Sequence, residues 1–301
     1  MPESEMRQME SEARKFNKFI KELKDLKAEA PEIFGVATGT KLDELFYYVE
    51  FDEKTKQFKK KVLGGIPYRS IMNIVGVADT GKSVFAEQFA VYQAARGYKV
   101  LFVTVESPAE FLYSSLKQKA YALGLDFNKV ESNIVVLDAS KSYQLRENIM
   151  SVIKTMETAI TKKHCSVTII DSVTGFYEHK EMLARQIVRA LFNFLKQHKQ
   201  TALLVSQKRS SQQAESAEAA GGLAVAHIVD GTIIFDKKLI ETRFDQSLYG
   251  LPIGSVLRTM RIDGCRLSAH SSDTWVMEIT DKGIIEIKEK LSDFIKRKGK
   301  S

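Results

Sequence analysis

The stretch that decides the fold is the apolar run Ile71-Met72-Asn73-Ile74-Val75 followed by Gly76-Val77-Ala78-Asp79-Thr80-Gly81-Lys82-Ser83-Val84. The apolar run predicts a buried strand, and the apolar periodicity that starts at Val84 predicts a helix. A loop of the form G-x-x-x-x-G-K-S lies between them. Backbone N–H groups of such a loop, together with the positive end of the following helix, bind phosphate. Residues 76–84 therefore predict a P-loop that holds ATP, with Lys82 on the terminal phosphates and Ser83 on Mg²⁺. A chance match in a glycine-rich turn is the alternative, and both flanks argue against it.

A second element of this chemistry is the apolar run Val167-Thr168-Ile169-Ile170, which ends in Asp171. In P-loop enzymes a carboxylate at this strand end lies beside the loop and holds Mg²⁺. An Asp after a strand is, taken alone, usually a turn former or a helix cap. Because a P-loop precedes it in the chain, we expect Asp171 to contribute to the metal site.

Two further polar side chains follow predicted strands. Glu106 comes directly after the run Val100–Val105, where a carboxylate can orient the attacking water or accept its proton. The other interpretation of Glu106 is a cap for the helix that follows Pro108. Gln207 follows the run Leu203–Ser206 and could sense the terminal phosphate, although a surface Gln at a strand end explains it equally well.

The rest of the chain around the P-loop alternates apolar runs with helical patterns from Ser70 to Ser206. Continuous apolar strands that alternate with helices predict a parallel sheet covered on both faces, that is, an α/β P-loop core. After residue 228 the helices stop. Strand-like runs at 229–235, 255–262, 274–279 and 284–287 predict an antiparallel extension of the same sheet.

The segments outside this core are small. Apolar residues at helical spacing over 5–28 predict an N-terminal amphipathic helix within residues 1–31. The ATPase domain is expected to span residues 32–288, with an inserted strand or hairpin near 48–62, and a basic tail to cover 289–301. Residues 288–301 carry +4 of the net charge of +7, which weakens the case for a broad nucleic-acid-binding face.

Composition excludes several classes of protein. A chain of 301 residues with 44% hydrophobic and 28% charged residues is typical of a globular protein with one main domain. We do not expect the first residues to form a leader peptide, and no apolar window is long enough to span a membrane, so we expect a cytoplasmic location. Cys165 and Cys265 are expected to stay reduced, and the five histidines have no metal-ligand spacing.

Taken together, these motifs resemble the RecA-like superfamily and, within it, the KaiC-like ATPases. The resemblance covers roughly residues 36–288 and depends on an ordered set of motifs rather than on the P-loop alone. A further segment, Gly221–Asp230, is similar to the RadA recombinases. The motifs that carry the KaiC-like resemblance, besides the P-loop, are Thr38–Leu45, Gly64–Pro67, Val103–Pro108, Val136–Ser140, Ile169–Ser172, Arg261–Gly264 and Glu278–Ile284.

The resemblance implies a RecA-type core, a ring or filament, most simply a hexameric homo-oligomer, and ATP held where two subunits meet. It also implies that Arg261 acts on the neighbouring subunit's nucleotide. Two departures predict slow turnover. The KaiC pattern has adjacent glutamates where this chain has only Glu106, and it has a Lys-x-Arg pair where this chain has Arg261 with Asp263 at the second position. A basic finger raises phosphoryl-transfer rates by about 10³–10⁵.

Three hypotheses for function follow. The first is a KaiC-like ATPase that acts as a nucleotide-dependent oligomeric switch. The second is a RadA-type DNA-binding protein, in which the polar loop Lys208–Gly222 and the basic tail contact phosphates; the low charge of the remaining chain disfavours it. The third is a signalling scaffold or autokinase whose partner protein the sequence does not reveal.

Overall fold

The computed structural model describes residues 17–178, 180–208 and 225–298. The chain divides into two compact units, Met1–Glu32 and Ile33–Ser301. In the first unit, the described residues form the short 3₁₀ helices η1 (Asn17–Phe19) and η2 (Leu23–Leu26), and η2 buries no residue. Residues 17–28 thus do not continue the amphipathic helix expected over 5–28, and the remainder of that prediction lies outside the described residues. An isolated apolar stripe gains little helical stability without a packing partner.

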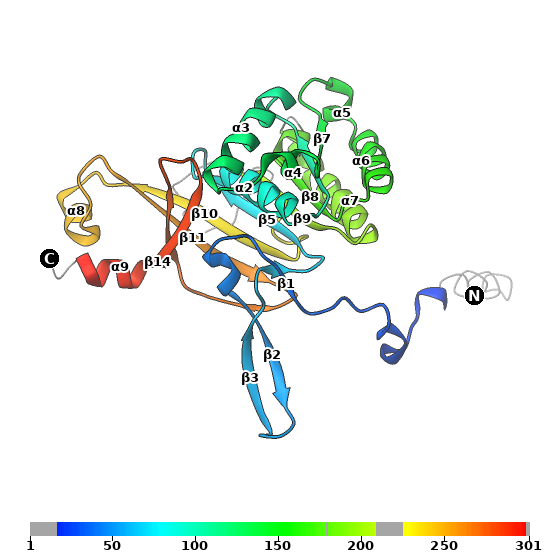
Figure 1. Cartoon of the computed structure of the whole chain (residues 1–301), viewed down its shortest axis with the longest axis horizontal. Helices are drawn as coiled ribbons and strands as arrows, with labels where there is room; N and C mark the ends of the chain where they lie inside the picture. Colours follow the sequence, from blue (N-terminus) through cyan, green and yellow to red (C-terminus); the bar gives the residue numbers. More distant parts are fainter. Residues whose placement is uncertain (1–16, 179, 209–224, 299–301) are drawn as a thin grey trace, which may run out of the picture. The chain divides into compact units, whose positions relative to one another are not determined.

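A nine-stranded sheet forms the centre of the second unit, in the order β14-β13-β11-β10-β5-β9-β8-β6-β7 (Figure 1). The six strands from β10 to β7 in this order are parallel, and β11, β13 and β14 extend the sheet in antiparallel fashion. This arrangement confirms the predicted fold. The bounds are β5 (Ile71–Gly76), β6 (Val100–Thr104), β7 (Ile134–Asp138), β8 (Val167–Asp171), β9 (Thr201–Gln207), β10 (Gly231–Leu239), β11 (Val256–Cys265), β13 (Trp275–Ile279) and β14 (Ile285–Lys290).

Helices cover both faces of the parallel part of the sheet. One apolar core lies between the sheet and helices α2 (Lys82–Ala95), α3 (Ala109–Ala122) and α4 (Phe127–Glu131). A second core lies on the other face, under α6 (Ile149–Lys163), α7 (Ala184–Gln197) and the 3₁₀ helix η4 (Val173–Phe176). Every residue of β5 and β6 is buried. Burial from both sides explains why these strands read as continuous apolar runs.

The helical segment between β7 and β8 is divided into α5 (Tyr143–Glu147) and α6. The break is at Asn148, whose side-chain oxygen accepts hydrogen bonds from the backbone N–H groups of Met150 (3.0 Å) and Ser151 (3.3 Å). An Asn side chain that bonds to nearby backbone favours a helix start over a helix interior. Between β8 and β9, the 3₁₀ helix η5 (Glu181–Leu183) leads directly into α7.

The segment before the P-loop forms small elements. Strands β1 (Gly35–Val36) and β4 (Ile66–Pro67) pair with each other, and η3 (Lys41–Glu44) lies between them in the chain. The insertion predicted near 48–62 is a hairpin of β2 (Phe46–Asp52) and β3 (Gln57–Val62), to which β12 (Ala269–His270) adds a third strand. Every residue of β3 is exposed.

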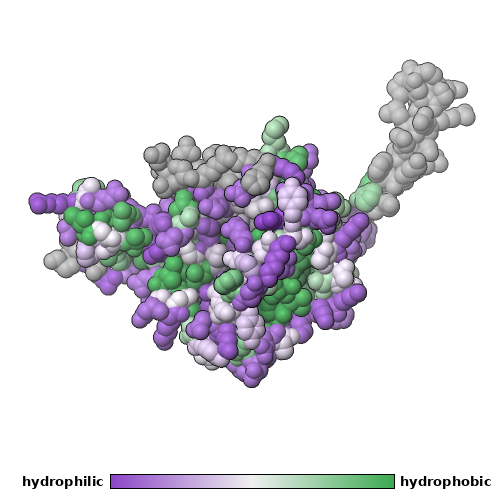
Figure 2. Space-filling view, turned by 90° about the horizontal axis from the view of Figure 1, so that it is seen from above, coloured by the Kyte–Doolittle hydropathy of each residue, from purple (hydrophilic) through white to green (hydrophobic). Residues whose placement is uncertain are grey.

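The C-terminal region contains helical segments that the sequence analysis did not anticipate. Helix α8 (Arg243–Tyr249) begins with a capping box of Thr242 and Asp245 and ends at Gly250. Helix α9 (Leu291–Lys298) occupies most of the expected tail, and its Phe294 packs into a small core with Ile240 and Val276. The basic tail is therefore folded as far as residue 298. Apolar surface is visible where α8 and α9 lie, at the left of Figure 2, in keeping with the exposed ring of Phe244.

None of the helices within the described ranges is long and apolar enough to cross a membrane. The thiols of Cys165 and Cys265 are both free, and Cys165 is buried.

Candidate active site

The P-loop connects the end of β5 to the start of α2, as the motif predicts. Gly76 lies against β10, and a Cβ atom added to it would come within 2.3 Å of the carbonyl oxygen of Phe235. Gly81 precedes α2 with a φ of 97°, in the left-handed region that glycine adopts without steric cost. The close approach of β10 at Gly76 and the left-handed backbone at Gly81 explain why glycines bound the loop.

The side chain of Lys82 lies inside the loop it belongs to. Its ammonium group donates a 2.7 Å hydrogen bond to the carbonyl oxygen of Val77, which also accepts a 3.0 Å bond from the Thr80 hydroxyl. Burial lowers the pKa of Lys82, and the carboxylates of Asp171 and Glu106 act in the opposite direction. The loop therefore holds a desolvated cation at the position where a phosphate-binding loop needs one.

Asp171 is the last residue of β8 and lies beside the start of α2. Burial raises the pKa of Asp171 to about 6, although a hydrogen bond from Ser83 lowers it. Repulsion from Glu106 and Glu87 raises it further. A carboxylate and a hydroxyl are hard oxygen ligands, the type that Mg²⁺ prefers.

The donor set fits a P-loop magnesium site rather than an all-protein metal site. Within residues 17–178, 180–208 and 225–298, no group of three or more His, Cys, Asp or Glu could hold a metal ion. Mg²⁺ in nucleotide sites is typically bound by one or two protein oxygens, phosphate oxygens and water. Ser83 and Asp171 could be the protein ligands of such a site.

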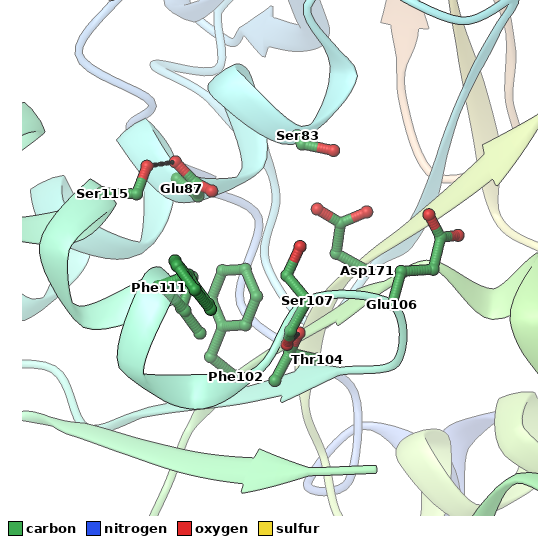
Figure 3. Close-up of a pocket in the computed structure, with 10 residues that line it drawn as sticks. Ser83, Glu87, Phe102, Thr104, Glu106, Ser107, Phe111, Ser115 and Asp171 are labelled. Atoms are coloured by element: carbon green, nitrogen blue, oxygen red, sulfur yellow. Dashed lines mark hydrogen bonds between the residues drawn. The ribbon is translucent and has the colours of Figure 1, made fainter. Parts of the chain in front are cut away.

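Glu106 follows β6, the neighbour of β8 in the sheet, so its strand end meets the same edge as Asp171. The Ser172 hydroxyl donates a 2.5 Å hydrogen bond to its Oε1. Asp171 and Glu106 both point their carboxylates toward the side of the cavity where Ser83 lies (Figure 3). The structure therefore brings together three of the predicted residues, Ser83, Asp171 and Glu106.

A cavity of about 230 Å³ opens between these groups and α3. Glu87 also lines it, and sequence analysis missed this residue. Glu87 lies four residues after Ser83, hence on the same face of α2, and that spacing is visible in the sequence. Its carboxylate accepts a hydrogen bond from Ser115 (2.5 Å) and forms an ion pair with Lys119 (2.5 Å), both on α3. The ten residues that line the cavity are Ser83, Glu87, Phe102, Thr104, Glu106, Ser107, Phe111, Leu112, Ser115 and Asp171.

Gln207 is placed next to the P-loop. It is the last residue of β9, it pairs with Gly76 in the register of β5 and β9, and its side chain is exposed. Its backbone N–H donates a 3.0 Å hydrogen bond to the Thr174 hydroxyl. The loop predicted over Lys208–Gly222 lies outside the described residues from 209 onward.

Arg261 is not among the residues that line the cavity. It lies in the middle of β11, opposite Ile234 of β10, and its guanidinium forms a 3.3 Å ion pair with Asp263. Arg261 thus contributes no side chain to the cavity of its own chain. This is compatible with the action on a neighbouring subunit that the family resemblance implies.

Comparisons with known proteins bear on the family and the fold of this chain. The model of a family described as "ATPase: KaiC" matches residues 36–292. UPF0273 proteins of Thermotoga maritima (27% identity) and Pyrococcus furiosus (28%) match 74% and 76% of this chain and 89% and 90% of their own lengths. The crystal structure of the KaiC-like protein PH0186 from Pyrococcus horikoshii OT3 superposes with a TM-score of 0.62 at 21% identity, covering 85% of this chain and 100% of that one. The structural likeness supports the fold.

Proposed function

The chain belongs to the KaiC family of ATPases, and from this premise we propose that it binds and slowly hydrolyses Mg-ATP and that bound nucleotide controls its assembly into a ring. The observation that carries the proposal is the convergence of Lys82, Ser83, Asp171 and Glu106 on one edge of the sheet. ATP is the cofactor proposed for this site, with Mg²⁺ beside it.

Each residue has a role in the proposed reaction. Backbone N–H groups of residues 76–84 and the Lys82 ammonium would hold the phosphates, while Ser83 and Asp171 would hold the metal. Mg²⁺, when bound, would neutralise charge on the phosphate oxygens. Glu106 would orient the attacking water and accept its proton, and the Ser172 hydroxyl holds the carboxylate in place for this task. Gln207, on the strand next to β5, is the proposed sensor of the terminal phosphate.

Slow turnover is part of the proposal. Glu106 has no adjacent glutamate in the sequence, and Asp263 holds the guanidinium that the resemblance assigns to the neighbouring site. An enzyme that keeps ATP bound for a long time is suited to act as a switch, since its state then follows nucleotide occupancy. The hexameric ring and the cytoplasmic location stay predictions, as does the existence of a partner protein that responds to the nucleotide state. DNA binding is not favoured.

One experiment tests the proposal directly. Particle mass by light scattering and ATPase rate are measured with and without Mg-ATP, and again with DNA added. We expect a Mg-ATP-dependent increase in mass toward six copies of the 34.0 kDa chain, with a low ATPase rate that DNA leaves unchanged. A mass that does not respond to nucleotide would contradict the switch, and a rate that DNA raises several-fold would favour the RadA-type function.

A further inference from the structure

The P-loop contains an acidic residue at a position that is unfavourable for phosphate binding. Asp79 has a φ of 61°, in the left-handed region that Asp tolerates better than most residues, and its side chain is 69% exposed. An anion in a loop that binds another anion weakens that binding by Coulomb repulsion. The environment of Asp79 indicates how the protein accommodates this charge.

Two cations lie beside Asp79. The Lys237 ammonium is 3.2 Å from Asp79 Oδ2, and the Arg258 guanidinium is 3.3 Å from the same oxygen. The ion pairs lower the pKa of Asp79, chiefly through the Lys237 hydrogen bond, so Asp79 is ionised at neutral pH. Asp79 of the P-loop thus forms ion pairs with two basic side chains, Lys237 and Arg258.

The sheet places this pair of bases at the nucleotide edge. Lys237 and Arg258 are direct partners in the register of β10 and β11, so their side chains leave the sheet side by side. They share a face with Phe235 and Met260, which pack in the core that contains α2. The carbonyl of Phe235 lies against Gly76 at the start of the loop. Lys237 therefore follows by two residues in the chain Phe235, whose carbonyl oxygen lies against the P-loop.

Two observations indicate that these cations can do more than neutralise Asp79. The Lys237 ammonium is 3.2 Å from the carboxylate of Asp79, a residue of the P-loop itself, so its charge lies next to the predicted phosphate position. The Arg258 Nε is buried without a hydrogen-bond partner among the described residues, so this guanidinium has an unused donor. An unsatisfied buried donor costs about 1–3 kcal/mol, and a phosphate oxygen is an acceptor that could satisfy it.

We propose that Lys237 and Arg258 are phosphate-binding residues of the same subunit, which Asp79 holds in place as a competing anion until the nucleotide phosphates take over their charges. The proposal rests on the proposed function, because it needs a nucleotide at the P-loop. It assigns Asp79 the role of lowering nucleotide affinity, and thereby of setting the nucleotide concentration at which the site fills.

A double-mutant cycle tests this, with dissociation constants for ATP and ADP measured by displacement of a fluorescent ATP analogue. The variants are Asp79→Asn, which retains a side chain suited to the left-handed region, Lys237→Met and the combination of both. Lys238→Met is the matched control, since Lys238 forms an ion pair with Asp245 of α8 at 3.0 Å. We expect tighter ATP binding by about threefold to tenfold for Asp79→Asn and weaker binding by about tenfold for Lys237→Met.

The decisive result is the effect of Lys237→Met in the Asp79→Asn background. If Lys237 contacts phosphate, the loss of about tenfold remains, because the interaction does not require Asp79. If Lys237 only neutralises Asp79, the second substitution has no effect, and the proposal is overturned. Lys238→Met should bind like the unaltered protein, and a loss there would show a general charge effect and would also overturn it. Failure of the unaltered protein to bind nucleotide would instead sink the proposed function, and this inference with it.

Discussion

The P-loop edge and the β2–β3 hairpin are opposite cases within one unit of this chain. At the P-loop edge, the Lys82 and Asp171 side chains are desolvated and make specific contacts, as the Lys82 ammonium does with the Val77 carbonyl oxygen. Along the hairpin the residues are largely exposed, and the Phe58 side chain is 74% exposed. Loss of a contact is costly only where burial prevents water from replacing it. The comparison predicts large effects at the edge and small effects on the hairpin.

The largest effect is expected from Glu106→Gln. Gln retains the size and can still accept the Ser172 hydrogen bond, but it cannot take a proton from water. We expect the ATPase rate to fall by about 10²–10⁴ while ATP binding is retained. Steady-state rates and nucleotide binding are measured together. Glu110→Gln is the control, because Glu110 is exposed and forms a surface ion pair with Lys141 at 2.7 Å. A rate that stays within twofold would remove Glu106 from the mechanism.

Next in size is Phe85→Ala in α2, directly after the P-loop. Phe85 is 1% exposed, and its ring packs edge-on against Phe235 at a centroid distance of 5.6 Å. Truncation of a buried Phe leaves a cavity, so we expect a loss of about 3–5 kcal/mol in the free energy of unfolding. Chemical denaturation measures this change. A loss below about 1 kcal/mol would indicate that the helix beside the loop is less rigidly packed than the structure implies.

Asp171→Asn tests the electrostatics of the same edge of the sheet. Unlike Phe85→Ala, it is expected to raise the free energy of unfolding of the nucleotide-free protein. The pKa of Asp171 is raised from 3.8 to about 6, so between these pH values the folded protein binds more protons than the unfolded chain. The free energy of unfolding therefore falls as pH rises through this window, and the ionised group is a net cost at pH 7. Removing the charge should stabilise the nucleotide-free protein by about 1–3 kcal/mol at pH 7.

The same variant should lose the tightening of ATP binding by Mg²⁺, and in the unaltered protein this tightening should decline below about pH 6. Denaturation curves at pH 4 and pH 7, with and without Mg-ATP, separate the two effects. The stabilisation should be near zero at pH 4, where the carboxyl group of the folded protein is already protonated. Equal stabilisation at both pH values would contradict the assigned cause.

The same contrast explains which features could be predicted from the sequence. Buried parallel strands lead into the P-loop, Asp171 and Glu106. In the sequence, a long apolar run followed by a polar residue has few interpretations other than a buried strand and its end. Glu87 escaped notice because its role depends on Ser115 and Lys119, which are distant in the chain. Likewise, Lys237 and Arg258 meet Asp79 only through the register of β10 and β11. Pairing between strands distant in the chain is a tertiary property that local periodicity does not encode.

Sequence analysis also missed local helix signals in the C-terminal region, where only strands and a tail were expected. Thr242, Asp245 and Gly250 mark both ends of α8, yet the surrounding strand pattern concealed them. Phe294 in the presumed tail was an apolar residue among bases, and it anchors α9 to a small core. The net charge of this segment did not show that it folds. A helix can bury one apolar side chain and keep its basic side chains in solvent, so a basic segment can still be a packed helix.

The smallest effect is expected from Phe58→Ala on the hairpin, which is the counterpart of Phe85→Ala. The Phe58 ring packs against the half-exposed ring of Phe51 across the hairpin, at a centroid distance of 5.0 Å. Truncation should change the free energy of unfolding by less than about 0.5 kcal/mol and leave nucleotide affinity unchanged. Both are measured at a protein concentration low enough to keep the chain monomeric. If the loss in the free energy of unfolding is small for the monomer but increases when Mg-ATP raises the particle mass, the hairpin is buried between subunits. Contact between subunits would then explain why its aromatic rings are exposed in the single chain.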